Sequence, residues 1–273
     1  MNRVKNWKQF LNESNEIKES KPGEIIEVQA DDNTIKGEVY LTDSDIAYHG
    51  GLIDNIDDYL SKTALYLTKK KGAAVSWNKK GHLFTRLYEV KIKRGSKFIN
   101  SSPAGNDAST NRLNDEKEAL LPLGIVGMAD HKFRNNIQGG GMSEGLILDK
   151  SAIESFRVVP FREILNDENL KNQNYIYQSE VTSNLGLIGK DLFTIEAFYN
   201  SICAKVFRKK YPDITQKIKS GVANPFHKKG GPIDGLLQWS IITYIYKNKN
   251  IQSEIDNIVE SMSNDELREF ILS

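Results

Sequence analysis

The sequence has few of the features that mark secreted, membrane-bound or polyanion-binding proteins. It contains one cysteine, Cys203, which excludes an internal disulfide and favours a reducing compartment. No apolar run approaches the ~20 residues that a membrane-spanning helix needs, and the first residues do not form a secretory signal. Lysine and arginine number 37 against 36 aspartates and glutamates, so no excess charge predicts binding to membranes or nucleic acids. These absences predict a soluble cytoplasmic protein.

Hydrophobic patterning divides the chain of 273 residues into three parts. Residues 1–22 have apolar positions at helical spacing and then linker composition, which predicts an amphipathic leader and a linker. Residues 23–165 contain short β-branched or aromatic runs bounded by turn residues, and two predicted helices, at 56–62 and 110–121, interrupt them. The sequence therefore predicts an α+β domain over 23–165.

Residues 166–273 are predicted to be helical. The segment "TIEAFYNSICAKVFRKKY", residues 194–211, has one apolar face and stops before Pro212. Near the C-terminus, Ser263 and Glu266 have the spacing of a capping box at the start of another helix. We therefore expect the α+β domain to be followed by a smaller all-α domain.

Four features recur in order within the strand-rich part. An apolar strand ends in a histidine and two glycines, a second strand carries a tyrosine, a tryptophan follows eleven positions later, and a glutamate follows a glycine-rich loop. The residues are Tyr48-His49-Gly50, Tyr66, Trp77 and Glu144. Glycines at a strand end let a ligand approach the backbone closely, so these features predict a small-molecule site.

Together these residues resemble the ADP-ribosyltransferase superfamily, and in particular its His-Tyr-Glu branch, which includes the diphtheria-toxin and poly(ADP-ribose) polymerase types. In that branch one strand ends in Tyr-His-Gly, a second carries a tyrosine with another aromatic residue shortly after it, and a glutamate heads a late strand. The resemblance covers residues 40–160 and implies a split antiparallel β-sheet that binds NAD⁺. It leaves the helical part without an assignment.

The resemblance also implies a role for each residue. Tyr66 and Trp77 would stack on the cationic nicotinamide ring, for about 1 kcal/mol each. The backbone of Gly50 would bond the carboxamide, and His49 would hydrogen-bond a ribose hydroxyl. Glu144 would be catalytic, because a carboxylate beneath the ribose stabilises the oxocarbenium-like charge that develops as the glycosidic bond breaks.

Two positions depart from the family pattern. Trp77 stands where the family usually has tyrosine, so the phenol hydroxyl is not replaced. Met142, two residues before Glu144, stands where arginine-modifying members often have glutamine or glutamate, which counts against an arginine acceptor. The loop at 129–143 lies where the family reads its target, and His131, Lys132 and Arg134 in it favour an acidic or phosphate-bearing target.

The function that the resemblance implies is mono-ADP-ribosyl transfer from NAD⁺, with no metal, to a protein or nucleic-acid acceptor, with release of nicotinamide. One alternative is an NAD⁺ glycohydrolase on the same fold, in which water replaces the acceptor. Another is a non-catalytic structural or binding protein. A third, the RNA 2′-phosphotransferase branch, is disfavoured because basic residues for an RNA phosphate are not evident at the matching strand ends.

Each residue also has an ordinary structural interpretation. His49 could be satisfied by backbone at a strand end, Tyr66 and Trp77 could be core aromatics, and Glu144 could be a solvated charge. His82, His131 and His227 lack metal-ligand spacing, so a zinc site is not predicted. Cys203 lies beside the apolar face of a predicted helix and is expected to be packed there.

The N-terminus has a second resemblance. "WKQFLNES" is similar to the short leaders of proteins packaged inside tailed-phage capsids, which a prohead protease cuts after a Leu-x-Glu sequence, here Leu11-Asn12-Glu13. This would imply a phage enzyme delivered with the genome to act on host targets. An amphipathic helix that docks on the body of the protein is the alternative interpretation.

Overall fold

The computed structural model of the protein describes residues 19–30, 33–76, 86–101, 110–135, 144–171, 174–176, 192–221 and 233–273. Within them the chain divides into two compact units, residues 19–75 with 86–158, and residue 76 with 159–273. The division after Val158 lies close to the boundary expected after residue 165. Most of the predicted leader, residues 1–18, lies outside the described residues.

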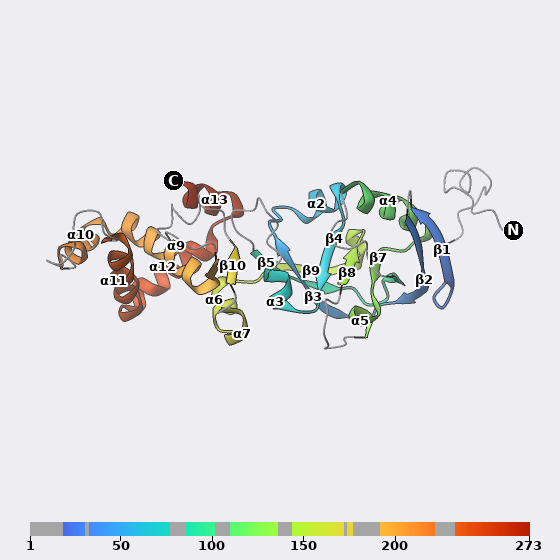
Figure 1. Cartoon of the computed structure of the whole chain (residues 1–273), viewed down its shortest axis with the longest axis horizontal. Helices are drawn as coiled ribbons and strands as arrows, with labels where there is room; N and C mark the ends of the chain where they lie inside the picture. The colour runs from blue at the N-terminus through green and yellow to red at the C-terminus, as the bar shows by residue number, and fades with distance from the viewer. Residues whose placement is uncertain are drawn as a thin grey trace. The chain divides into compact units, whose positions relative to one another are not determined.

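Nine of the described strands form one sheet in the N-terminal unit (Figure 1). In the order in which they neighbour one another, the strands are β1 (Ile25–Ala30), β2 (Asn33–Leu41), β6 (Lys97–Asn100), β7 (Gly127–Ala129), β8 (Glu144–Ile147), β4 (Leu65–Thr68), β3 (Asp45–Gly51), β5 (Arg86–Ile92) and β9 (Ile153–Val158). All neighbours are antiparallel except β6 and β7, which are parallel. The predicted α+β class is confirmed, and the sheet is mostly antiparallel, with the one parallel pair of β6 and β7.

The sheet has its fewest backbone pairs near its centre, between β3 and β4. β3 pairs with β5 at every residue from Asp45 to Gly51, but it pairs with β4 at one position, Tyr48 with Thr68. β4 in turn pairs with β8 along its whole length, and there Thr68 is opposite Glu144. We call this junction, between residues 45–51 and residues 65–68, the seam.

Side chains of successive strand residues alternate between two hydrophobic cores, one on each face of the sheet. Phe98 and Ile147 belong to the first core, whereas their neighbours Ile99 and Leu146 belong to the second. The helix α2 (Ile56–Lys62) contributes Leu60 to the first core. The helix α4 (Thr110–Leu120) contributes its apolar residues to the second, namely Leu113, Ala119 and Leu120.

The helices predicted at 56–62 and 110–121 are both confirmed. α2 begins after Asn55, whose side chain accepts the backbone N–H groups of Asp57 and Asp58. α4 ends at Leu120 and continues as a 3₁₀ turn, Leu121–Leu123, and a second 3₁₀ turn, Lys150–Ala152, follows β8. Two short helices were not predicted, α3 (Lys71–Ser76) and α5 (His131–Arg134).

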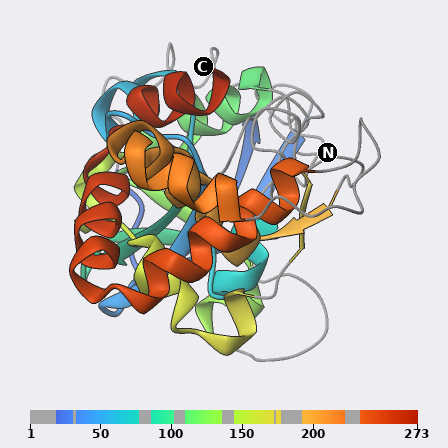
Figure 2. The ribbon, with the colours of Figure 1, turned by 90° about the vertical axis from the view of Figure 1, so that its left-hand side faces the viewer.

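The C-terminal unit is mainly helical (Figure 2). Its helices are α6 (Phe161–Leu165), α7 (Glu168–Lys171), α9 (Ile195–Lys210), α10 (Pro212–Gly221), α11 (Ile233–Lys247), α12 (Lys249–Ser261) and α13 (Asn264–Leu272). Two strands, β10 (Asn174–Ile176) and β11 (Leu192–Thr194), pair antiparallel in the same unit. The expectation of an all-α domain is therefore wrong in this detail, because two three-residue strands were too short to detect in the sequence.

The helix boundaries in this unit follow the capping signals of the sequence. The side chain of Thr194 accepts the N–H of Ala197 at the start of α9, and the helix ends before Pro212 as predicted. The capping box between Ser263 and Glu266 is present at the start of α13. No helix among the described residues has the length and hydropathy that crossing a membrane would require.

Candidate functional site

His49 lies in β3 beside the seam, and its ring bonds the neighbouring strand. Its Nδ1 lies 2.8 Å from the carbonyl oxygen of Tyr66 in β4. If the register of Tyr48 with Thr68 continued, Gly50 would be opposite Tyr66, but no such pair forms. The imidazole therefore donates a hydrogen bond to the Tyr66 carbonyl, a group that could bond the backbone of β3 if the pairing of the two strands continued.

This contact fixes the chemical character of the ring. A carbonyl oxygen only accepts, so Nδ1 carries the proton, and in the neutral ring Nε2 is then a hydrogen-bond acceptor. The ring is 8% exposed and packs edge-on against Tyr59, with centroids 5.8 Å apart. It also lies 6.2 Å from the ring of Tyr88, whose hydroxyl donates to the carbonyl of Ile53. His49 is held in one orientation by these contacts.

The glycines after His49 have different surroundings. Gly50 pairs with Leu87 of β5. A Cβ added to Gly51 would lie 2.7 Å from Nε2 of His49, well inside van der Waals contact. A side chain at position 51 would therefore displace the imidazole, so Gly51 is required by the ring rather than by a turn. The sequence pattern indicates Gly50 as a ligand-binding position but gives no sign of this role for Gly51.

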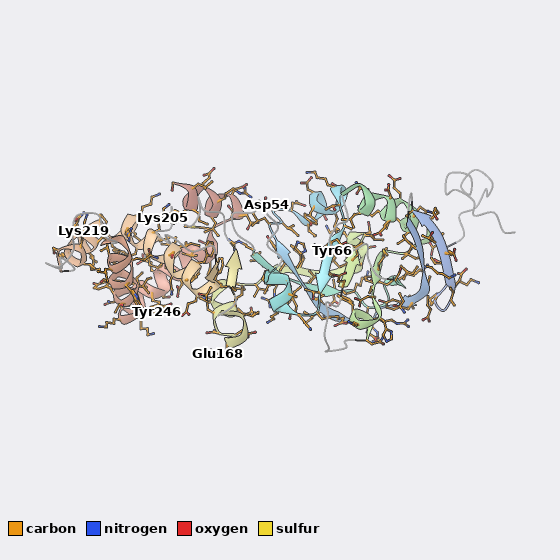
Figure 3. All side chains as sticks on the ribbon, viewed as in Figure 1. Asp54, Tyr66, Glu168, Lys205, Lys219 and Tyr246 are labelled. Atoms are coloured by element: carbon orange, nitrogen blue, oxygen red, sulfur yellow. The ribbon has the colours of Figure 1, made fainter. Side chains whose placement is uncertain are left out.

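Tyr66 lies in β4, on the opposite side of the seam from β3 (Figure 3). It is opposite Leu146 of β8, is partly buried, and packs against the second core. Tyr66 and Thr68 share one face of the sheet, because side chains two residues apart on a strand point the same way. Tyr66 thus serves partly as a core aromatic, and it lies on the same face as the strand end at Thr68 and Glu144.

Glu144 is the first residue of β8 and completes a row across three strands. Tyr48, Thr68 and Glu144 are successive partners in β3, β4 and β8, so their side chains share a face. The side chain of Glu144 is partly buried. Burial, and next the negative charge of Asp130, raise the pKa of the Glu144 carboxyl above its ordinary value of 4.5.

Asp130, between β7 and α5, ties Glu144 to the rest of the unit. Its Oδ2 accepts the backbone N–H of Glu144 at 3.0 Å, and its own N–H donates to the Glu144 carbonyl at 3.0 Å. Its Oδ1 accepts the N–H of Phe133 at 2.6 Å and caps α5. Sequence analysis missed Asp130, although an aspartate just before an apolar helical turn is a usual N-cap signal.

The other residues singled out in the sequence are not part of this row. Trp77 and Met142 lie outside the described residues, as do His82 and His227. Arg134, expected to face a target, instead bonds Glu38 at 2.8 Å, and its guanidinium lies 4.3 Å from the centroid of the Tyr40 ring. Both partners belong to β2, so Arg134 is committed within the unit. The expectation that this loop favours an acidic or phosphate-bearing target stays a prediction, and His131 is exposed and contacts Asn135.

Two further expectations concern cysteine and metal. Cys203 is buried in α9 as predicted, and burial raises its pKa, so it is a packed thiol rather than a reactive one. No cluster of histidine, cysteine, aspartate and glutamate suited to a metal ion occurs within the part of the chain that the structure describes.

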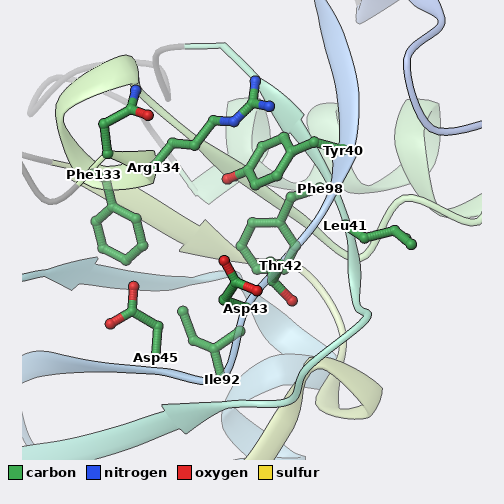
Figure 4. Close-up of a pocket in the computed structure, with 10 residues that line it drawn as sticks. Tyr40, Leu41, Thr42, Asp43, Asp45, Ile92, Phe98, Phe133 and Arg134 are labelled. Carbon is green, nitrogen blue, oxygen red and sulfur yellow. The ribbon is translucent and has the colours of Figure 1, made fainter.

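A hollow of about 230 Å³ lies between α5, the end of β2 and the start of β3 (Figure 4). The hydroxyl of Tyr40 and the carboxylates of Asp43 and Asp45 point into it. Lys69, which follows β4, pairs with Asp45 and lies over the ring of Phe133. Burial lowers the pKa of Lys69 to about 8, but its ion pair with Asp45 gives it a structural role.

The hollow and the Glu144 side chain lie on opposite faces of the sheet. The floor of the hollow is formed by Phe98 and Phe133 of the first core. A Cβ on Gly145 would lie 2.7 Å from the Phe133 ring, so that ring covers the face of β8 opposite to the one that Glu144 uses. The hollow is therefore separate from the row at Glu144.

Comparisons of the chain with protein-family models, with curated proteins and with solved structures found no match. The basis for a function is therefore the arrangement of His49, Tyr66 and Glu144 around the seam.

Proposed function

We propose that the protein is a mono-ADP-ribosyltransferase, which moves ADP-ribose from NAD⁺ to a protein or nucleic-acid acceptor and releases nicotinamide. One observation carries the proposal. His49, Tyr66 and Glu144 are far apart in the sequence, yet they lie on three adjacent strands, β3, β4 and β8, beside a seam with one backbone pair. Tyr66 and Glu144 share the face of the second core, whereas His49 is opposite Tyr88 on the face of the first core, and its ring bonds the Tyr66 carbonyl through the seam. The proposed site therefore extends through the seam from one face of the sheet to the other.

The chemistry of the seam is suited to NAD⁺. The Nε2 acceptor of His49 matches a ribose hydroxyl, which donates. Tyr66 offers an aromatic ring for the cationic nicotinamide, a contact of about 1 kcal/mol, and Trp77 remains the predicted second ring. Gly50 and Gly51 have no side chains, so the backbone at the end of β3 is accessible for hydrogen bonds to the carboxamide of nicotinamide.

The proposed reaction breaks the bond between ribose C1′ and the nicotinamide nitrogen. Nicotinamide leaves as a neutral ring with the electron pair of that bond, and positive charge develops on the ribose. The Glu144 carboxylate stabilises that charge, and the acceptor then forms the new bond to C1′ and loses its proton. The burial of Glu144 strengthens this electrostatic interaction relative to one in open water.

Release of nicotinamide from NAD⁺ tests the proposal directly. Purified protein should release nicotinamide only when a bacterial lysate supplies an acceptor, and labelled NAD⁺ should then mark that acceptor. Release without lysate would replace the transferase by an NAD⁺ glycohydrolase on the same site. If neither condition gave release, the proposal would be wrong, and the non-catalytic alternative would stand.

Gly51→Ala tests the role of His49. The added Cβ would move the imidazole from the Tyr66 carbonyl, so KM for NAD⁺ should rise about 3- to 10-fold, the equivalent of roughly one hydrogen bond. Gly221→Ala in α10 is the control, because a Cβ there meets nothing within 4 Å. An unchanged KM in Gly51→Ala, with a melting temperature like that of the control, would argue that His49 does not contact NAD⁺.

The acceptor and the biological setting are proposed from the sequence. The motif Leu11-Asn12-Glu13 lies outside the described residues, so packaging in a phage capsid and action in a host cytoplasm remain predictions. Modification of protein against nucleic acid would be separated by treating the labelled lysate with protease or nuclease.

A further inference from the structure

The side chain of Asp130 makes more bonds than a helix cap requires. An N-cap residue normally satisfies one N–H in the first helical turn, and Oδ1 of Asp130 does this for Phe133. Its second oxygen, Oδ2, accepts the N–H of Glu144, which belongs to a different element, the strand β8. Serine or asparagine would cap α5 equally well, but only a carboxylate offers acceptor oxygens to both amides.

We propose that Asp130 is a positioning residue for Glu144, fixing the main chain of Glu144 against α5 and placing a second negative charge near its carboxyl group. The inference deepens the proposed transferase function and rests on it for its effect on turnover. Three hydrogen bonds carry it: the Asp130 carboxylate accepts the N–H groups of Phe133 and Glu144, and the Asp130 N–H donates to the Glu144 carbonyl.

The short helix α5, which Asp130 caps, is itself held in place by contacts of Phe133 and Arg134. The ring of Phe133 fills the space beside Gly145, where a Cβ would lie 2.7 Å away. Arg134, in the next position, bonds Glu38 and stacks on Tyr40 of β2. Asp130 thus connects Glu144 to a helix that is anchored at two other points, which holds the first residue of β8 in one place.

Three cationic side chains on neighbouring segments have partners other than Glu144. Lys69, which follows Thr68, pairs with Asp45, and Lys71 of α3 lies over the ring of Tyr48. Arg134 of α5 pairs with Glu38. Among the described groups, the one whose charge raises the pKa of Glu144 is Asp130.

Asp130→Asn is the first test. An amide side chain has one acceptor oxygen, so one of the two N–H groups loses its partner, and the second negative charge is lost. We expect kcat for nicotinamide release to fall about 10- to 100-fold, as for a small misplacement of a catalytic group, with KM for NAD⁺ little changed. The pH midpoint of Glu144, followed by NMR of carboxyl-labelled glutamate, should fall.

Asp149→Asn is the matched control. Asp149 lies just beyond the other end of β8, and its carboxylate also caps a short helical turn, accepting the N–H of Ser151 at 2.8 Å. The variant should lose similar stability without changing kcat or the titration of Glu144. If Asp130→Asn proves unstable, Asp130→Ser keeps an N-cap hydroxyl for α5 and still removes the acceptor for Glu144.

The outcomes separate this inference from the proposed function. A lower Glu144 midpoint in Asp130→Asn than in Asp149→Asn, in a protein that never releases nicotinamide, would support the positioning role and refute the transferase. An active protein in which both variants have wild-type kcat and the same Glu144 midpoint would overturn the positioning role alone. If Asp130→Asn lowered the melting temperature and changed nothing else, Asp130 would act as a helix cap alone and the positioning role would be refuted.

Discussion

Replacing Glu144 with glutamine is expected to lower nicotinamide release on the order of 10²- to 10³-fold, the usual cost of removing one electrostatic stabiliser of a transition state. Glutamine keeps the size of the side chain and loses its charge. The backbone pairing of position 144 with Thr68 and its bonds to Asp130 involve the main chain, so the substitution leaves them in place. The loss should therefore appear in kcat, with little change in KM for NAD⁺.

Glu154→Gln is the control for this variant. Glu154 lies in β9 of the same sheet, is exposed, and pairs with Lys91. It should retain full activity, because exposed ion pairs contribute little and it is not part of the row at the seam. Normal turnover in Glu144→Gln would remove Glu144 from the site and with it the assignment of the whole row.

The raised pKa of Glu144 also predicts how this variant behaves with pH. The folded protein binds the Glu144 proton more tightly than the unfolded chain does. The stability that this proton contributes is complete below pH 4.5 and is lost as the pH rises through the raised folded pKa. At neutral pH the partly buried charge is a small cost, so Glu144→Gln should be at least as stable as the wild type, and a lower melting temperature would contradict this reasoning.

Gly127→Ala is expected to destabilise the N-terminal unit by about 3 kcal/mol, at the upper end for overpacking a core. A Cβ at position 127 would lie 2.3 Å from the ring of Phe98, which is fully buried. The ring lies over β7 in the parallel pair of β6 and β7 and is packed in the first core, so a methyl group at position 127 forces the ring and its neighbours to shift. Urea unfolding followed by circular dichroism would measure the change.

A double variant shows whether the Phe98 ring is the cause. Phe98→Leu alone should destabilise through lost packing, but it makes room for the alanine at position 127. The effects of Gly127→Ala and Phe98→Leu should therefore sum to more than the effect of the double variant. If the destabilisation of the two single variants summed to that of the double variant, the β7 backbone, rather than the Phe98 ring, would be the cause of the effect at position 127.

Much of the candidate site could be predicted from the sequence because its residues stand at strand ends. Tyr48-His49-Gly50, Tyr66 and Glu144 each border a short apolar run with turn residues beside it, and each run forms a strand. What the sequence could not supply is which strands are neighbours. That β3, β4 and β8 lie side by side depends on pairing between distant segments, which follows from the fold.

The residues that were missed act through distant backbone groups. Asp130 bonds the N–H of Glu144, fourteen positions away, and no local pattern indicates that contact. Gly51 is required by a ring that turns back across the seam, whereas a sequence shows only that two glycines follow a histidine. Arg134 was expected to favour an acidic target because its loop lies where the resembled family reads its target, and the sequence does not show that Glu38 and Tyr40 of β2 contact it.

The seam has a consequence for how such a site can change over evolutionary time. A full ladder of backbone hydrogen bonds holds neighbouring strands about 4.8 Å apart. Two strands that pair along their whole length therefore have a fixed spacing. Beyond Tyr48 and Thr68, the His49 ring links β3 to β4 through its hydrogen bond to the Tyr66 carbonyl, and Tyr59 and Tyr88 pack against that ring. Substitutions at those aromatic positions would shift the His49 ring while the strand pairs of the sheet stay in place, so the proposed site could change without endangering the fold.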